Sequence, residues 1–192
     1  SRGLVGSEMC IRDSLMTLLV DKNQQIRGKY FTYNFGEIRR ITKEISLLIR
    51  EEIQNDSTYS MPVLGNKDFD PSIPGDTAYH EIPFWSFINQ KGDTVTGEIM
   101  SNKVCLVDFF FTHCPTICPI MTSNMKKIQS KLENECIDDV ELISYTVDPD
   151  RDSVERLREY ANSYDVNFDN WNLLTGDQKT CLLYTSDAAD DG

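Results

Sequence analysis

The sequence predicts an α/β protein with a central sheet that contains parallel strands. Residues 104–111 form a near-continuous apolar run rich in aromatic and β-branched side chains, which is typical of a strand buried on both faces. A helix should follow, because apolar residues recur at spacings of four, three and four over 121–132. Residues 140–147 repeat the strand pattern, and a second helical stripe covers 154–161. Strand and helix therefore alternate along this part of the chain.

The segment that joins the first strand to its helix, Phe109–Pro119, is the most informative of the sequence. Cys114 and Cys118 lie four residues apart, and a proline follows each of them. Pro119 suits the first turn of a helix, because the N–H group that it lacks would have no partner there. The two sulfurs should lie at a helix N-terminus at the exposed end of the sheet, where the helix dipole favours thiolate over thiol.

Several kinds of site fit two such cysteines. They can bind a soft ion such as Cu(I), form a structural disulfide, or act as a thioredoxin-type redox pair, although that motif has two intervening residues and this one has three. A structural zinc site fits less well, because zinc takes four ligands. His80 and Cys136 are far away in the sequence, and His113 adjoins Cys114.

Three segments around these cysteines resemble the SCO/SenC copper chaperones of cytochrome c oxidase assembly. They are residues 109–125 with a CPxxCP core, residues 142–161 with a VDPxRD turn, and residues 170–177 with WxxLTGD. The resemblance runs from about residue 61 to residue 177. It implies a thioredoxin-like three-layer sandwich with a central mixed sheet and an N-terminal hairpin.

The same resemblance implies a metallochaperone. Cys114 and Cys118 would bind a copper ion as Cu(I), and the protein would deliver it to the binuclear copper site of cytochrome c oxidase. The partners would be the copper-binding subunit of the oxidase, other copper chaperones and thiol reductants. In the alternative function, thiol–disulfide oxidoreductase, the two cysteines would be catalytic and act on the cysteines of an oxidase subunit. The compartment would be the periplasm facing the inner membrane, or the mitochondrial intermembrane space.

The family's third copper ligand is a histidine downstream of the Leu-Thr-Gly-Asp segment. This sequence has two histidines, His80 and His113, and neither matches that position. We therefore expect the chain to bind Cu(I) through its two cysteines and to hold Cu(II) poorly.

The order of the segments departs from that of the family. Residues 15–54 have the pattern strand–turn–strand–helix and resemble the hairpin and helix that close the family's domain, so the fold should contain a permuted C-terminal hairpin and helix. A polar linker at 55–60 would join them to 61–178, the N-terminal and central part of the domain. Tandem domains, a chimeric sequence and a generic hairpin are three open explanations. In each case we expect residues 15–52 to complete the sheet of 61–178.

The two ends of the sequence differ in kind from the rest. Residues 1–14 and 179–192 resemble translated adapter sequence and show no usable periodicity. Neither segment is expected to contribute to the fold.

Composition excludes some functions. A net charge of −12 argues against nucleic-acid binding. No segment has the roughly 18 apolar residues that a membrane-spanning helix needs. The anchor expected for the family is thus absent from this sequence, and membrane association would depend on an anchor outside it.

Overall fold

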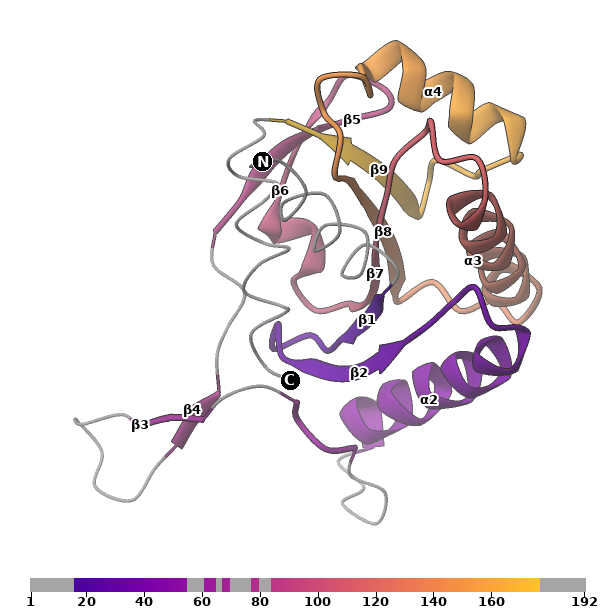
Figure 1. Cartoon of the computed structure of the whole chain (residues 1–192). Helices are drawn as coiled ribbons and strands as arrows, with labels where there is room; N and C mark the ends of the chain where they lie inside the picture. The colour runs from indigo at the N-terminus through magenta and orange to yellow at the C-terminus, as the bar shows by residue number, and fades with distance from the viewer. Residues whose placement is uncertain (1–15, 55–60, 65–66, 70–76, 80–83, 177–192) are drawn as a thin grey trace, which may run out of the picture.

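The computed structural model describes residues 16–54, 61–64, 67–69, 77–79 and 84–176 (Figure 1). These residues form one seven-stranded mixed sheet, a separate two-stranded sheet and three α-helices. The elements are β1 Thr17–Val20, β2 Ile26–Tyr30, α2 Phe35–Gln54, β3 Lys67–Phe69, β4 Thr77–Tyr79, β5 Ser86–Asn89, β6 Thr94–Thr96, the 3-10 helix η2 Gly97–Met100, β7 Val104–Phe110, α3 Ile117–Asn134, β8 Val140–Thr146, α4 Val154–Ser163 and β9 Trp171–Thr175.

The central sheet has the strand order β2-β1-β7-β8-β9-β5-β6. Strands β7, β8 and β9 are parallel to one another, and the remaining pairs are antiparallel. This confirms the predicted mixed sheet with a parallel centre. β3 and β4 pair only with each other and form the second, two-stranded sheet.

The predicted strand and helix around the cysteines are both confirmed. Every residue of β7 is buried, as expected for a strand covered on both faces. In α3 the apolar stripe Met121, Met125, Ile128 and Leu132 is buried against the sheet. Pro119 occupies the third position of α3, within its first turn.

The hairpin and helix of residues 15–54 extend the same sheet. β1 lies antiparallel to β7, with Thr17 opposite Asp108 and Val20 opposite Cys105, and β2 forms the sheet edge. Ile41, Ile45 and Leu48 of α2 are fully buried. The predicted hairpin and helix therefore share a core with the rest of the domain, while 1–14, the linker 55–60 and 179–192 lie outside the described residues.

The helices α2, α3 and α4 cover one face of the sheet, and other elements pack against the opposite face (Figure 1). Buried side chains of α2, α3 and α4 join one apolar cluster with alternate residues of the strands. The other cluster gathers Trp85, Phe87, Met100 and Tyr145, from the β5–β6 hairpin, η2 and the opposite side of β8. The β5–β6 hairpin occupies the place of the expected N-terminal hairpin, and His80 lies outside the described residues.

One edge of this sheet is suited to carry a site. The carboxyl ends of parallel strands meet at the same edge of a sheet, and the loops that follow them lie close together. Here these are the loop between β7 and α3, which holds Cys114, and the loop between β8 and α4, which holds Asp148–Asp152.

Candidate metal and redox site

The two cysteines of the CPxxCP segment lie within one turn of chain at the start of α3. Cys118 is the second residue of the helix, and Cys114 precedes it in the loop after β7. The backbone N–H of Cys118 donates to Cys114 Sγ over 3.4 Å. The side chain of Thr116, the N-cap residue, accepts no hydrogen bond from a helix N–H. The sulfur of Cys114 instead accepts from one of the first-turn N–H groups, which have no partner within the helix.

Both sulfurs are less accessible than the sequence predicted. Cys114 is 8% exposed and Cys118 is 1% exposed, so the expectation of sulfurs at an exposed position is wrong. The reason is packing: the first turn of α3 lies on the sheet, and both cysteines belong to the apolar cluster that includes Phe110 and Met125. Both thiols are therefore buried at the start of α3.

The two thiols differ in acidity. Burial alone would raise the pKa of Cys114, yet hydrogen bonds from backbone N–H groups, that of Cys118 foremost, hold it below its ordinary value. Burial foremost, together with the nearby Cys114 and Asp108, raises the pKa of Cys118 to about 12. Cys114 is therefore the more acidic thiol of the pair, and Cys118 is the less acidic one.

The donor set suits a soft, low-coordinate ion. Within the part of the chain that the structure describes, no group of three or more His, Cys, Asp or Glu side chains is placed to hold a metal. Two thiols fit Cu(I), which prefers sulfur, and do not fit the four-ligand requirement of zinc. The four cysteines of the described residues, Cys105, Cys114, Cys118 and Cys136, form no disulfide.

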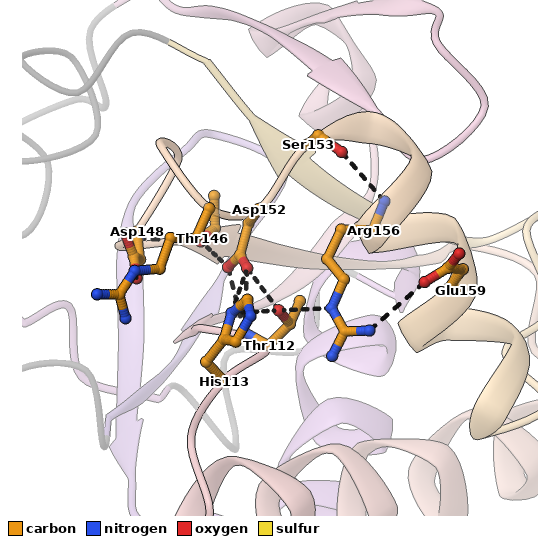
Figure 2. A network of polar contacts seen from close by, with 9 residues as sticks. Thr112, His113, Thr146, Asp148, Asp152, Ser153, Arg156 and Glu159 are labelled. Carbon is orange, nitrogen blue, oxygen red and sulfur yellow. Dashed lines mark hydrogen bonds and ion pairs between the residues drawn. The ribbon is translucent and has the colours of Figure 1, made fainter.

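The polar contacts of the His113 ring are with Thr112 and with Asp152, which lies in the loop after β8. Its Nδ1 lies 3.1 Å from Thr112 Oγ1 and 3.7 Å from Asp152 Oδ1 (Figure 2). The ring is 46% exposed. The sequence places His113 beside Cys114, but its ring is engaged by Thr112 and Asp152.

Asp152 organises the polar network behind the cysteine loop, and the sequence analysis did not single it out. Its carboxylate is fully buried and accepts hydrogen bonds from Thr112 N over 3.1 Å and from Thr112 Oγ1 over 2.6 Å. The hydroxyl of Thr146, at the end of β8, also donates to it (Figure 2). Asp152 thereby ties the end of β7 to the end of β8.

The network continues into α4. Arg156 Nε donates to Thr112 Oγ1 over 3.2 Å, and its guanidinium lies 3.4 Å from a Glu159 carboxylate oxygen. Ser153 Oγ accepts the backbone N–H of Arg156, so Ser153 is the N-cap of α4. The loop that carries Cys114 is thus fixed to the beginning of α4 (Figure 2).

Asp148 fits the structural role that its turn predicts. It is partly exposed and lies 3.7 Å from Arg151 Nε, within the turn that follows β8. Among the acids of this turn, Asp152 and not Asp148 supports the cysteine loop. Residue type and position do not distinguish the two, because both residues stand in one acidic turn.

A second buried acid, Asp108, lies in β7 on the side of the sheet that the helices cover. Ser144 Oγ donates to its Oδ1, and Trp171 Nε1 donates to the Ser144 hydroxyl over 2.9 Å. Burial raises the pKa of Asp108 to about 7. The sequence did carry a signal for this residue, since Asp108 is the one charged side chain in the apolar run 104–111.

These features define a thioredoxin-like α/β protein with a paired-cysteine site at the start of a helix. The SCO1/SenC family model matches residues 75–183, more than half of the chain. The chain therefore belongs to the SCO1/SenC family. No helix among the described residues combines the length and apolar character that crossing a membrane requires.

Similar proteins are known from sequence and from solved structures. The SCO1 protein homologue of Bacillus subtilis is 45% identical over 101 residues, which are 53% of this chain and 52% of that protein. The chain thus spans about half the length of this relative. BsSco, a member of the Sco family of cytochrome c oxidase assembly proteins with a disulfide switch, is 41% identical with a TM-score of 0.51, over 56% of this chain and 62% of that one. Copper-bound ScoI of Bradyrhizobium japonicum is 25% identical with a TM-score of 0.50, over 56% of this chain and 66% of that one.

Proposed function

We propose that this chain is the copper-holding part of a metallochaperone for cytochrome c oxidase. The observation that carries the proposal is the contact between the Cys118 N–H and Cys114 Sγ, which places two sulfurs within one helical turn. Soft thiolate ligands select Cu(I). The copper-bound relative ScoI supports the choice of metal.

The two thiols differ in exposure and in pKa, so they should bind copper one after the other. Cys114 is the more exposed cysteine and the one with the lowered pKa, so its thiolate is the entry ligand. Cys118 follows and loses its proton as the second Cu–S bond forms, since a metal-bound thiol is deprotonated. Release runs in reverse: a thiolate of the acceptor binds the copper, the bond to a cysteine of this chain breaks, and that cysteine regains a proton.

The acceptor in this proposal is the copper-binding subunit of cytochrome c oxidase. Other copper chaperones or thiol reductants would load and reduce the site. The natural protein would work in the periplasm facing the inner membrane, or in the mitochondrial intermembrane space. The description of BsSco as one of the oxidase assembly proteins supports this assignment.

A second candidate function is thiol–disulfide exchange with an oxidase subunit, favoured by the unequal pKa values of the two cysteines. The Cys114 thiolate would attack one sulfur of the partner's disulfide, and the other sulfur would leave as a thiolate. Cys118, after losing its proton, would attack Cys114 Sγ and release the second partner thiol. The partner gains the two electrons that the cysteines lose in forming their own disulfide.

One comparison separates the two candidates. The chain is expressed with copper and its metal content is measured beside those of Cys114→Ser and of Cys136→Ser, which removes an exposed thiol outside the site. The chaperone proposal expects copper in the parent chain and in Cys136→Ser, and none in Cys114→Ser. If no copper co-purifies and the chain reduces a model disulfide in a Cys114-dependent manner, the reductase function replaces it.

We further propose that residues 15–54 and 61–178 act as one domain, whatever the origin of their order. The pairing of β1 with β7 and the burial of Ile41 and Ile45 support this. After limited proteolysis between residues 54 and 61, we expect the two fragments to elute together from a size-exclusion column without denaturant. Their separation under native conditions would sink the single-domain proposal.

A further inference from the structure

Helices α2 and α3 pack beside each other (Figure 1). A groove lined mainly by positively charged side chains lies between them. Its volume is about 330 Å³ and it opens to solvent. Arg39, Lys43 and Arg50 line it from α2, and Lys131 and Glu135 line it from α3. Four cations and one carboxylate thus meet in a protein whose net charge is −12.

Most of this positive charge has no carboxylate partner within the part of the chain that the structure describes. Glu135 lies 3.9 Å from Lys131 one turn away, and both side chains are 48% exposed. Among the described residues, no ion pair joins Arg39, Lys43 or Arg50 to a carboxylate. Their mutual repulsion is therefore relieved only by solvent and mobile ions, or by a bound anion.

The neighbouring Arg40 shows that this arrangement is specific to one face of α2. Arg40 Nε lies 2.9 Å from Glu44, and its Nη1 lies 3.4 Å from Glu37. Glu37 and Glu44 therefore form their ion pairs with Arg40, which does not line the groove. Arg39, one residue earlier, is part of the groove lining.

The three cations of α2 form a row. Arg39, Lys43 and Arg50 are separated by four and seven residues, which places them on one helical face over roughly 16 Å. A row of this length exceeds a single phosphate. It matches an anion that carries several charged groups.

We propose that this groove binds a small anion with two or more phosphate groups. Guanidinium groups bind phosphate through paired, charge-assisted hydrogen bonds, and lysines add point charges. The volume falls within the range of small-molecule sites, about 300–1,000 Å³, which favours a compact ligand over a macromolecule.

The groove is separate from the cysteine site. Lys131 follows Cys118 by thirteen residues along α3, about 20 Å of helix. Anion binding and copper binding therefore have distinct residues, and the loss of one in an experiment does not imply the loss of the other.

The test is a calorimetric titration of the full chain with inorganic tripolyphosphate at low and high salt. Arg39→Gln and Arg40→Gln make the same charge change at adjacent positions. We expect Arg39→Gln to weaken binding about tenfold, Arg40→Gln to change it less than about twofold, and Arg39→Gln/Lys43→Gln/Arg50→Gln to abolish it. All three side chains are exposed, so folding, checked by circular dichroism, is expected to be unchanged.

A second arm distinguishes free phosphate from a lipid headgroup. The chain and the triple variant are sedimented with vesicles of phosphatidylcholine alone and with vesicles that contain phosphatidylglycerol. Saturable, groove-dependent binding to tripolyphosphate supports the proposal. Groove-dependent binding to the anionic vesicles alone would overturn it in favour of a lipid surface, because the phosphatidylglycerol headgroup carries one phosphate. Absence of binding in both arms, or equal losses in Arg39→Gln and Arg40→Gln, would overturn the proposal.

Discussion

The beginnings of α3 and α4 lie at the same edge of the sheet and are built differently. Each helix follows a parallel strand. At α4, the Ser153 hydroxyl accepts the N–H of Arg156 over 3.3 Å, as an ordinary N-cap does. At α3, no hydroxyl takes this role, and Cys114 Sγ accepts the N–H of Cys118 over 3.4 Å. The start of α4 is thus capped by the unreactive hydroxyl of Ser153, whereas the start of α3 is capped by the thiol sulfur of Cys114, which can also bind metal or form a disulfide.

A buried aspartate lies near the beginning of each helix, and the two aspartates differ in how many side-chain hydroxyls donate to them. Asp152, at the α4 end, accepts hydrogen bonds from Thr112 and Thr146. Asp108, on the α3 side, has the single hydroxyl of Ser144 as its side-chain donor, and burial raises its pKa to about 7. The α4 end is therefore a structural anchor. The α3 end holds Asp108, Cys114 and Cys118, whose pKa values are all shifted from their ordinary values.

The largest expected effect concerns Asp108 and pH. Its pKa is raised from 3.8 to about 7 in the folded protein, so the folded state keeps a proton that the unfolded state has lost. The stability that this proton confers is complete below about pH 4 and falls as the pH rises toward 7, by about 1.4 kcal/mol per unit and ~4 kcal/mol in total. Above pH 7 the difference should stay constant.

The Asp108→Asn variant isolates this effect. It retains the size of the side chain and has no carboxyl to titrate, so its stability should gain on that of the parent chain between pH 4 and pH 7. Urea unfolding of both proteins at several pH values measures the difference. Parallel stability curves across that range would show that Asp108 does not titrate as described.

Removal of the Asp152 carboxylate should destabilise the α4 end. Asp152→Ala leaves the buried hydroxyls of Thr112 and Thr146 and one backbone N–H without their acceptor, for an expected loss of about 3 kcal/mol. Asp152→Asn keeps one acceptor oxygen and should lose less. Denaturant midpoints of both variants, taken at pH 7, test this ranking; an Asp152→Asn protein as unstable as Asp152→Ala would contradict it.

The caps themselves give the smallest and most direct contrast. Ser153→Ala should lower the free energy of unfolding by about 1 kcal/mol, because a capping hydroxyl is removed. Thr116→Ala should change it by less than about 0.5 kcal/mol, because the Thr116 side chain caps nothing. Thermal unfolding of the two variants is sufficient to compare them. Equal losses would mean that the two helix ends are not built differently.

The sequence predicted most of the sheet and its helices because their signals are local. The apolar run 104–111 predicted β7, and the stripe of α3 was visible from residue spacing alone. The spacing of Cys114 and Cys118 likewise predicted their meeting at a helix start.

The features that the sequence did not reveal depend on contacts between distant segments. The burial of Cys118 follows from the packing of α3 on the sheet, which residue spacing does not describe. Asp152 bonds to Thr112, which is forty residues away. The strand β9 has only five residues and was noted as a family segment without being assigned as a strand. Whether a side chain such as Asp148 or Asp152 points inward is fixed by such contacts and not by composition.

The central claim is that two sulfurs at the open helix end hold Cu(I) without a third ligand. Anaerobic titration of the reduced chain with Cu(I), followed by exposure to air, tests it most directly. The account predicts one Cu(I) per chain, no uptake by Cys114→Ser or Cys118→Ser, full uptake by Cys136→Ser, and loss of the metal on oxidation. Tight retention of Cu(II) after air oxidation, or uptake that survives loss of both Cys114 and Cys118, would contradict it.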